Sequence, residues 1–368
     1  MTNTVFKINV GPQHPSTHGV LRLIADVDGE VIKSIEPVIG YLHRGLEKAA
    51  ESRLYVQYLP MVDRIDYVSG FMCQEAFCSA VEKLCSITVP ERAQYIRVLL
   101  MELNRISSHL LWLGTYLMDL GASSPIFYAF RERECILKIF ENITGQRMMF
   151  NFHTFGGVKR DLSEQNLQDI QEFLNIFPKR IQEYESILSD NPIFISRTKG
   201  IGILSSKTAL NYSITGANLR ASGVDIDFRK KQPYLVYDKI DFNISTEKTG
   251  DCYSRYLVRI DEMKNSVNII SQCVNYLSDN NGEYKNGNVY PLNLKPEKNI
   301  VTSFIESSRG LLACSIYSDG SDRPYRVKWR TGSFYSIQLL PDLLKGRYFS
   351  DIMAIFGSLD IILPEADR

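Results

Sequence analysis

Residues 90–122 are the longest stretch of the sequence in which apolar side chains follow helical spacing. They recur three or four positions apart, at Leu99, Leu103, Ile106, Leu110 and Leu113. The other faces of this stretch are also largely apolar, and a helix of that kind is buried on nearly all sides. Pro90 and Glu91 suit its first turn, since proline is tolerated there and a carboxylate complements the positive end of the helix dipole. The fold must therefore surround this helix with other elements.

The same spacing predicts four further helices. They are expected at residues 75–86, 126–144, 163–188 and 253–278. The segment 278–288 is rich in Gly and Asn and polar throughout, and we expect it to be a disordered surface loop.

Strand patterns lie near both ends of the chain. Apolar and polar residues alternate over residues 4–40, and Asp28-Gly29 marks a hairpin turn, so about three antiparallel strands are predicted there. The pattern returns after residue 300, with a turn at "SDGSD". The predicted α+β fold has three parts, which are a small antiparallel sheet at 1–40 with a loop at 11–19, a helical core at 41–298, and C-terminal strands with a tail at 299–368 that return to the region of the first sheet.

The composition excludes several classes of partner and cofactor. Lys plus Arg and Asp plus Glu both number 42, so no net charge attracts the chain to nucleic acid or to an anionic membrane. No apolar run reaches the roughly 18 residues that span a bilayer. The seven cysteines include no C-x-x-C pair, which indicates a reduced, intracellular chain without an iron-sulfur cluster of its own. The first ten residues resemble no signal or transit peptide, so we expect the protein to work in the compartment that makes it.

His14 and His18 lie in the loop "GPQHPSTHG", residues 11–19, between two predicted strands. Taken alone they have three interpretations: imidazoles that cap backbone groups of a turn, part of a metal site, or a binding loop. A metal site needs more ligands, and no cysteine or carboxylate pair with ligand spacing accompanies the histidines. No metal site is therefore predicted in this chain.

Charged groups also interrupt two apolar stretches. "YLPMVDRIDYVSG" contains Arg64, Asp66 and Tyr67, which are either an ion-paired turn or part of a site, because buried polar groups need partners and are over-represented at sites. Asp119 ends the apolar helix, where it is either a feature of the helix end or the partner of a cation.

Many segments, in order along nearly the whole chain, resemble one family. They are "GPQHPSTHGVLRL", "GYLHRGLEK", "DRIDY", "ERAQYIRVLLMELNRISSHLLWLGTYLMDLGA", "FYAFRERE", "GQRMMFN", "GGVKRDL", "NPIF", "LRASG", "RYLVRI" and "DIMAIFGSLDIILPEADR". On these segments the chain resembles the D subunit of the proton-pumping NADH-quinone oxidoreductase, respiratory complex I, a family that includes the H subunit of the chloroplast and cyanobacterial complexes.

The resemblance implies the fold of the nickel-iron hydrogenase large subunit, from which the family descends. Hydrogenases of this kind hold their metal with one C-x-x-C early in the chain and one late. The early position corresponds here to the "RIDY" region and the late one to the tail near Asp360, and neither has its cysteines. A hydrogenase is therefore disfavoured, and a structural scaffold without a redox role is the other alternative.

The resemblance also implies a quinone site without a cofactor bound by this chain. By the family pattern, Tyr67 and His18 are expected to be the two hydrogen-bond donors for the quinone oxygens, and Asp119 is expected to pair with His18. A tyrosine with a pKa near 10 keeps its proton at neutral pH, whereas a histidine with a pKa near 6.5 easily takes up a new proton after it has donated one. The carboxylate would fix the tautomer of the imidazole. The remaining residues of the quinone-site loop are Gly11, Pro12, His14, Pro15, Ser16, Thr17 and Gly19.

Arg64 and Met149 are expected, by the same resemblance, near the terminal iron-sulfur cluster of a partner subunit. A fixed positive charge at Arg64 would favour the reduced cluster. Many relatives have a histidine at the position of Met149. Because methionine takes up no proton, we expect the cluster's reduction potential to depend little on pH and to suit a low-potential quinone such as menaquinone.

The resemblance implies the rest of the assembly. Iron-sulfur clusters and FMN belong to partner subunits, and quinone, either menaquinone or ubiquinone, is the substrate. The implied partners are the iron-sulfur B subunit, the C subunit and the membrane-embedded H subunit at the quinone entrance, with no nucleic acid among them. The expected location is the cytoplasmic side of the bacterial plasma membrane, and the electron donor is either NADH or ferredoxin.

Overall fold

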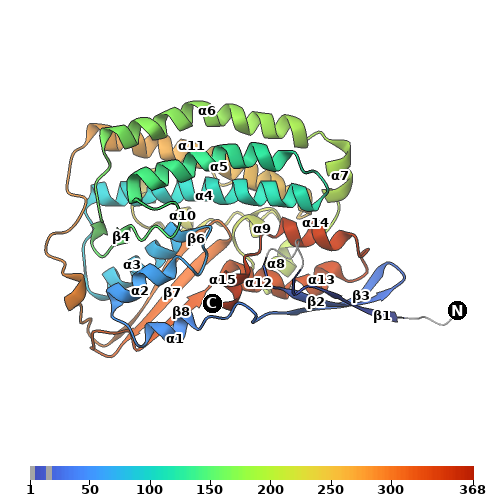
Figure 1. Ribbon diagram of the computed structural model, residues 1–368, viewed down its shortest axis with the longest axis horizontal. Coiled ribbons are helices and arrows are strands. Elements are labelled where there is room, and N and C mark those ends of the chain that lie inside the picture. Colours follow the sequence, from blue (N-terminus) through green and yellow to red (C-terminus); the bar gives the residue numbers. More distant parts are fainter. Residues whose placement is uncertain (1–4, 14–18) are drawn as a thin grey trace.

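A computed structural model describes residues 5–13 and 19–368. Its centre is helix α4 (Glu91–Asp119), which confirms the helix predicted over 90–122, with Pro90 as its N-cap. Helices α5 (Pro125–Thr144), α6 (Glu164–Leu188) and α11 (Cys252–Asp279) lie beside it and beside one another as a four-helix bundle (Figure 1). All four long helices begin and end within about three residues of the predicted bounds.

Shorter helices surround the bundle. Helix α3 (Gly70–Leu84) begins five residues before the predicted 75–86, and it packs on α4. The remaining helices are α1 (Leu46–Ala50), α2 (Tyr55–Val62), α7 (Pro192–Thr198), α8 (Ser206–Asn211), α9 (Gly216–Arg220), α10 (Phe228–Lys231), α12 (Gly332–Gln338), α13 (Leu340–Leu344), α14 (Asp351–Ser358) and α15 (Leu363–Asp367), with the 3-10 turns η2 (Tyr237–Lys239) and η3 (Pro291–Asn293). Together with the bundle they bury α4 on almost every side, as its sequence predicts.

The N-terminal sheet confirms the predicted antiparallel strands. It contains β1 (Val5–Val10), β2 (Arg22–Asp28) and β3 (Val31–Val38), in that order. Alternate residues of β2 are buried, and Gly29 adopts a positive φ of 63° in the turn that follows Asp28. The sheet projects from the helical part, at the right of Figure 1.

The C-terminal strands form a second sheet rather than joining the first. Strands β6 (Asn299–Ser307), β7 (Gly310–Ser318) and β8 (Arg326–Arg330) pair in that order, with "SDGSD" in the predicted turn. The free edge of β3 is instead hydrogen-bonded to the chain after α13. Ile32 N–H donates to the carbonyl of Arg347 at 2.9 Å, and Gly346 N–H donates to the carbonyl of Ile32 at 2.8 Å. The predicted α+β class is confirmed, but what returns to the first sheet is the helical tail.

The expectation of a disordered loop at 278–288 is wrong for its second half. Strands β4 (His153–Thr154) and β5 (Gly157–Val158) form a small hairpin. Lys285 pairs with Gly157 at the edge of this hairpin through an antiparallel bridge. Asn286 donates its backbone N–H to the carbonyl of Gly156 at 2.8 Å. These bonds hold the second half of the segment in place although most of its side chains face solvent.

The buried apolar residues fall into two main clusters. The larger one lies between the four-helix bundle, α2, α3 and the C-terminal sheet. The smaller one joins the buried face of the N-terminal sheet to α13, α14 and the tail. Within the described residues, no helix is both long and apolar enough to cross a membrane.

We expect Leu103→Ala to lower the free energy of unfolding by about 2–5 kcal/mol, because this fully buried side chain of α4 would leave a cavity. Ile176→Ala on α6 is the control, since its side chain is 53 % exposed and the loss should stay within about 0.5 kcal/mol. Urea denaturation followed by circular dichroism measures both. Equal losses would contradict the central position of α4.

Candidate functional site

Tyr67 lies in the turn between α2 and α3, whose other residues are mostly buried. Asn104 of α4 donates to the carbonyl of Val68 at 2.7 Å, and Asp66 Oδ1 accepts from Val68 N–H at 3.1 Å. These bonds fix the turn on both sides of Tyr67, whose own side chain is only partly buried. Partial burial raises the pKa of the Tyr67 hydroxyl, and the nearby Arg309 cation opposes that rise. The structure thus presents a protonated phenol on a rigid turn.

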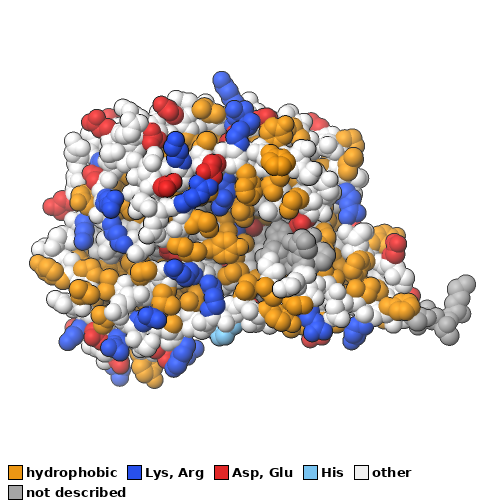
Figure 2. Space-filling view, in the orientation of Figure 1, with side chains coloured by type: hydrophobic (Ala, Val, Ile, Leu, Met, Phe, Trp, Pro, Cys, Tyr) orange, Lys and Arg blue, Asp and Glu red, His pale blue; other side chains and the backbone are white. Residues whose placement is uncertain are grey.

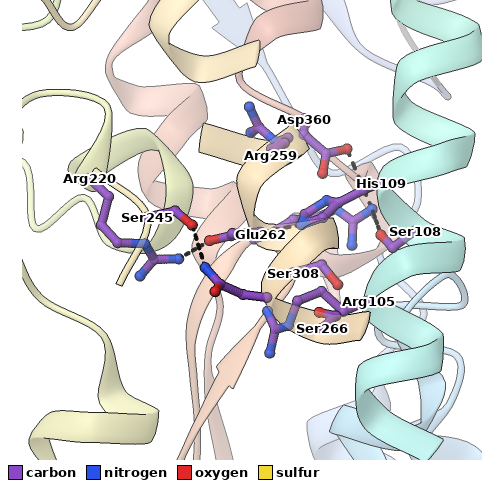
Figure 3. A network of polar contacts seen from close by, with 12 residues as sticks. Arg105, Ser108, His109, Arg220, Ser245, Arg259, Glu262, Ser266, Ser308 and Asp360 are labelled. Atoms are coloured by element: carbon purple, nitrogen blue, oxygen red, sulfur yellow. Dashed lines mark hydrogen bonds and ion pairs between the residues drawn. The ribbon is translucent and has the colours of Figure 1, made fainter. Parts of the chain in front are cut away.

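Arg309 organises the interior behind Tyr67. Its Nη1 donates to Asp66 Oδ2 at 2.7 Å and to Ser69 at 3.1 Å. Its Nη2 donates to Ser108 of α4 at 3.1 Å and lies 3.5 Å from Asp360 Oδ1 (Figure 3). One buried guanidinium therefore holds two buried carboxylates, one from the "RIDY" region and one from the tail. The two segments expected to correspond to a former metal site do meet, around an arginine.

A second buried network lies next to this one. His109 Nε2 is 2.7 Å from Glu262 Oε2, and Glu262 is also paired with Arg220 (Figure 3). Arg220 in turn lies 2.8 Å from Glu306. Burial lowers the pKa of His109 although Glu262 opposes this, which favours the neutral ring. A carboxylate can only accept, and the proton of the neutral ring is therefore on Nε2. The network links α4, α11, α9 and β6 across the core.

Asp119 is the last residue of α4 and is partly buried. Its predicted partner His18 lies outside the described residues, as do His14, Pro15, Ser16 and Thr17. The pairing of Asp119 with His18 therefore stays a prediction.

The described ends of the predicted quinone-site loop lie close together. Gln13 and Val20 form an antiparallel bridge, and Pro12 precedes it. Gly11 has a φ of +84°, and a Cβ there would lie 2.0 Å from the carbonyl oxygen of Leu21. On the other side, a Cβ at Gly19 would come within 3.2 Å of the Leu363 side chain in α15. Only glycine fits at position 11. The base of the loop packs against the C-terminal tail.

Arg64 and Met149 belong to segments that the structure brings together. Arg64 is exposed and follows the buried Asp63, whose Oδ2 accepts the N–H of Asn151 at 3.1 Å. Met149 is partly exposed and, like Asn151, adopts a positive φ, of 57° and 42° respectively. Asparagine tolerates positive φ, but methionine does not, so tertiary contacts must stabilise this segment at Met149.

Sequence reasoning did not identify Arg309 or the His109–Glu262 pair. A signal for Arg309 exists, because a single cation interrupts the buried strand and turn "IESSRGLL" and must find a carboxylate. The sequence contains no signal for its partners Asp66 and Asp360, because they lie more than 200 and about 50 residues away along the chain. Among the residues that the structure describes, no group of three or more His, Cys, Asp or Glu could hold a metal ion.

We expect Arg309→Met to lower the free energy of unfolding by about 3–5 kcal/mol, because Asp66 and Asp360 would lose their cation while staying buried. Arg323→Met removes an exposed pair with Asp322 and should cost at most about 1 kcal/mol. Thermal and urea unfolding compare the two variants. A loss for Arg309→Met no larger than that for Arg323→Met would show that the pair is not buried as described.

Known proteins resemble this chain over nearly its whole length. A family model described as "Respiratory-chain NADH dehydrogenase, 49 Kd subunit" matches residues 119–298 and 288–368. The D subunits of the NADH-quinone oxidoreductases of Bacillus mycoides, Bacillus cereus and Bacillus anthracis are each 46 % identical to the chain over 363 residues, which is 98 % of this chain and 98 % of each relative. The family resemblance, the fold and this extent of identity agree, and the chain belongs to the 49-kDa, or D, subunit family of the respiratory NADH-quinone oxidoreductase, complex I.

Proposed function

We propose that this complex I subunit forms one wall of a quinone site and that Tyr67 donates a hydrogen bond, and then a proton, to one quinone oxygen. The observation that carries the proposal is the setting of Tyr67: a partly exposed phenol on a turn fixed by α4, with a buried cation behind it. Such a group is a general acid held in one position. The substrate class is a menaquinone or ubiquinone.

The charges behind Tyr67 suit a proton that leaves and returns. When the phenol gives up its proton, Arg309 stabilises the phenolate, since this cation already opposes the rise in the pKa of Tyr67 that burial causes. Asp66 and Asp360 balance the same guanidinium, and they limit how far it favours the phenolate. The phenolate is then a base that readily takes up a new proton.

The second donor in the proposal is His18, with Asp119 as its partner. Quinone reduction takes up two electrons and two protons, so each of the two ring oxygens requires a donor. The carboxylate at the end of α4 would orient the imidazole and stabilise its charged form. In this arrangement the loop over 11–19 carries one donor and the turn before α3 carries the other.

Electrons reach the quinone, in this proposal, from the terminal iron-sulfur cluster of the B subunit, with Arg64 and Met149 beside that cluster. The C subunit and the membrane-embedded H subunit are the other proposed neighbours, and the latter places the chain at the cytoplasmic side of the bacterial plasma membrane. Exposed aromatic side chains on α5 support such contacts: Phe127 is 76 % exposed, and Tyr128 and Phe130 are also exposed. Figure 2 shows apolar side chains gathered on this face. Quinol formation would drive proton translocation in the membrane subunits.

The two alternatives make different demands on the same residues. A hydrogenase-type subunit needs thiolates where Arg309 meets Asp66 and Asp360, and arginine cannot be a metal ligand. A scaffold needs neither Tyr67 nor Asp119 for function. Variants at these two positions therefore separate the scaffold from the quinone-site subunit.

Tyr67→Phe should lower quinone reductase activity of the assembled complex by roughly 10²-fold or more, because the phenol proton is the one removed. Complex assembly and reduction of the iron-sulfur clusters by NADH should stay unchanged. Tyr325→Phe, at a tyrosine that is 68 % exposed near β8, is the matched control and should keep full activity. Full activity of Tyr67→Phe with the natural quinone would exclude Tyr67 as the donor and favour the scaffold.

Asp119→Asn should lower the same activity by roughly tenfold, since an amide orients the proposed imidazole but does not stabilise its charge. Asp261→Asn, at a half-exposed aspartate of α11, is its control. Steady-state rates at saturating quinone measure the effect. If the two variants retain equal activity, Asp119 does not support a donor.

A further inference from the structure

Asp63 differs from every other buried carboxylate in the described ranges 5–13 and 19–368. Most of them contact an arginine, namely Asp66, Glu75, Glu82, Glu102, Glu132, Asp227, Glu262, Glu306, Asp351 and Asp360. The others, Asp251, Glu365 and Asp367, accept hydrogen bonds on both oxygens. Asp63 is fully buried, and among the described residues it forms no ion pair and has one oxygen, Oδ1, without a partner. A buried carboxylate in this state is a candidate for proton binding.

The hydrogen bonds of Asp63 assign the position of that proton. Oδ2 accepts from Gln74 Nε2 at 2.9 Å and from the N–H of Asn151 at 3.1 Å. The orientation of Gln74 is unambiguous, because its Oε1 accepts the N–H groups of Phe152 and His153, both at 2.9 Å. Since both neighbours of Oδ2 are donors, a proton on this carboxyl group can only be on Oδ1.

The charges around Asp63 do not compensate for its burial. Arg64 on the same turn and Lys159 after β5 favour the ionised form, but neither is close enough for an ion pair. The Cys73 and Cys78 thiols of α3 are near enough for the Asp63 carboxylate to raise their pKa, but burial raises it more, and both thiols stay protonated. Burial therefore outweighs the two hydrogen bonds and the two cations, and raises the pKa of Asp63 to about 7.

We propose that Asp63 is a proton-binding group that takes up one proton on Oδ1 when the neighbouring iron-sulfur cluster of the partner subunit accepts one electron. The proposal rests on the proposed function, in which Arg64 and Met149 lie beside that cluster. Asp63 precedes Arg64 in the chain and is bonded to the backbone two residues after Met149. The electron comes from NADH through the other centres of the complex, the proton comes from solvent, and the carboxylate becomes a carboxylic acid.

Protonation leaves the segment around Met149 in place. Both hydrogen bonds of Oδ2 and both bonds of Gln74 persist when the proton is on Oδ1. The effect of the proton on the cluster is therefore electrostatic, through removal of one negative charge. The proposal predicts a reduction potential that depends on pH, whereas the expectation drawn from Met149 alone is a potential that depends little on pH.

The test is a redox titration of the terminal cluster in the assembled complex, followed by electron paramagnetic resonance between about pH 6 and pH 8. In the unmodified complex the potential should fall with rising pH, by up to about 59 mV for each tenfold drop in proton concentration. In Asp63→Asn the slope should disappear, because asparagine keeps the acceptor for Gln74 and Asn151 but binds no proton. A potential independent of pH in the unmodified complex would overturn the proposal even if the variant did not assemble.

An infrared difference spectrum of the reduced minus the oxidised complex gives a second readout. The unmodified complex should gain a carboxylic-acid C=O band on reduction, and Asp63→Asn should lack it. Asp251→Asn is the matched control, since Asp251 is also buried but has donors on both oxygens. A band that survives in Asp63→Asn would assign the proton to another group and overturn the proposal.

Arg64→Met separates failure of this inference from failure of the proposed function. Loss of its positive charge should lower the cluster potential, and it should move the sloping region to higher pH, because Arg64 favours the ionised form of Asp63. If Arg64→Met shifts the potential while Asp63→Asn retains the slope, the cluster is nearby and Asp63 is not its proton-binding group. If neither variant changes the cluster, the proposed placement of the cluster is wrong, and the inference fails with it.

Discussion

The burial of α4 on nearly all sides is the constraint on which the rest of the structure depends. This helix carries not only leucines but also Arg97, Glu102, Arg105 and His109, and all four side chains are buried. Removing a charge from water costs several kcal/mol unless a partner compensates. The three charged groups therefore need compensating partners, and the polar ring of His109 needs a hydrogen-bond partner. Most of these partners come from other segments, and these contacts determine how the segments are arranged.

The partners of α4 come from most of the chain. Arg97 pairs with Glu75 and Glu82 of α3, and His109 pairs with Glu262 of α11. Burial opposes ionisation of Glu102, but Arg105 and Arg229 outweigh it and lower its pKa to about 2. Arg105 also donates to the carbonyl of Glu306 in β6 at 2.7 Å. The bundle, the helices after it and the C-terminal sheet are thus joined through one helix.

The candidate site lies where the buried ion pairs around α4 approach the surface. Ser108 of α4 and Arg309 join the turn that carries Tyr67 to the tail that carries Asp360. Paired carboxylates such as Asp66 have a cation in direct contact, whereas Asp63, three residues earlier, has no described cation within ion-pair distance. Two kinds of acid therefore lie within one turn. One is balanced by a cation behind the phenol, and the other is free to exchange a proton.

Much of the fold could be predicted from the sequence, because helix and strand periodicity are local properties. The bounds of α5, α6 and α11, the three N-terminal strands and the turn at "SDGSD" all follow from spacing and turn residues. The α+β class follows in the same way. The edge pairing of β3 could not be predicted, since it depends on backbone groups near residue 346 and not on side-chain pattern.

By itself the sequence determined which residues are candidates: Tyr67 and Asp119 interrupt apolar stretches, and colinear motifs identify the family. Only the tertiary structure decided which charges are compensated. Arg309 shows this for a cation, because its carboxylates come from opposite ends of the chain. Asp63 shows it for an acid, because its burial and its unpartnered oxygen are set by α3 and by the segment after Met149. The ionisation of a side chain depends on neighbours and solvent in three dimensions, and no local pattern records them.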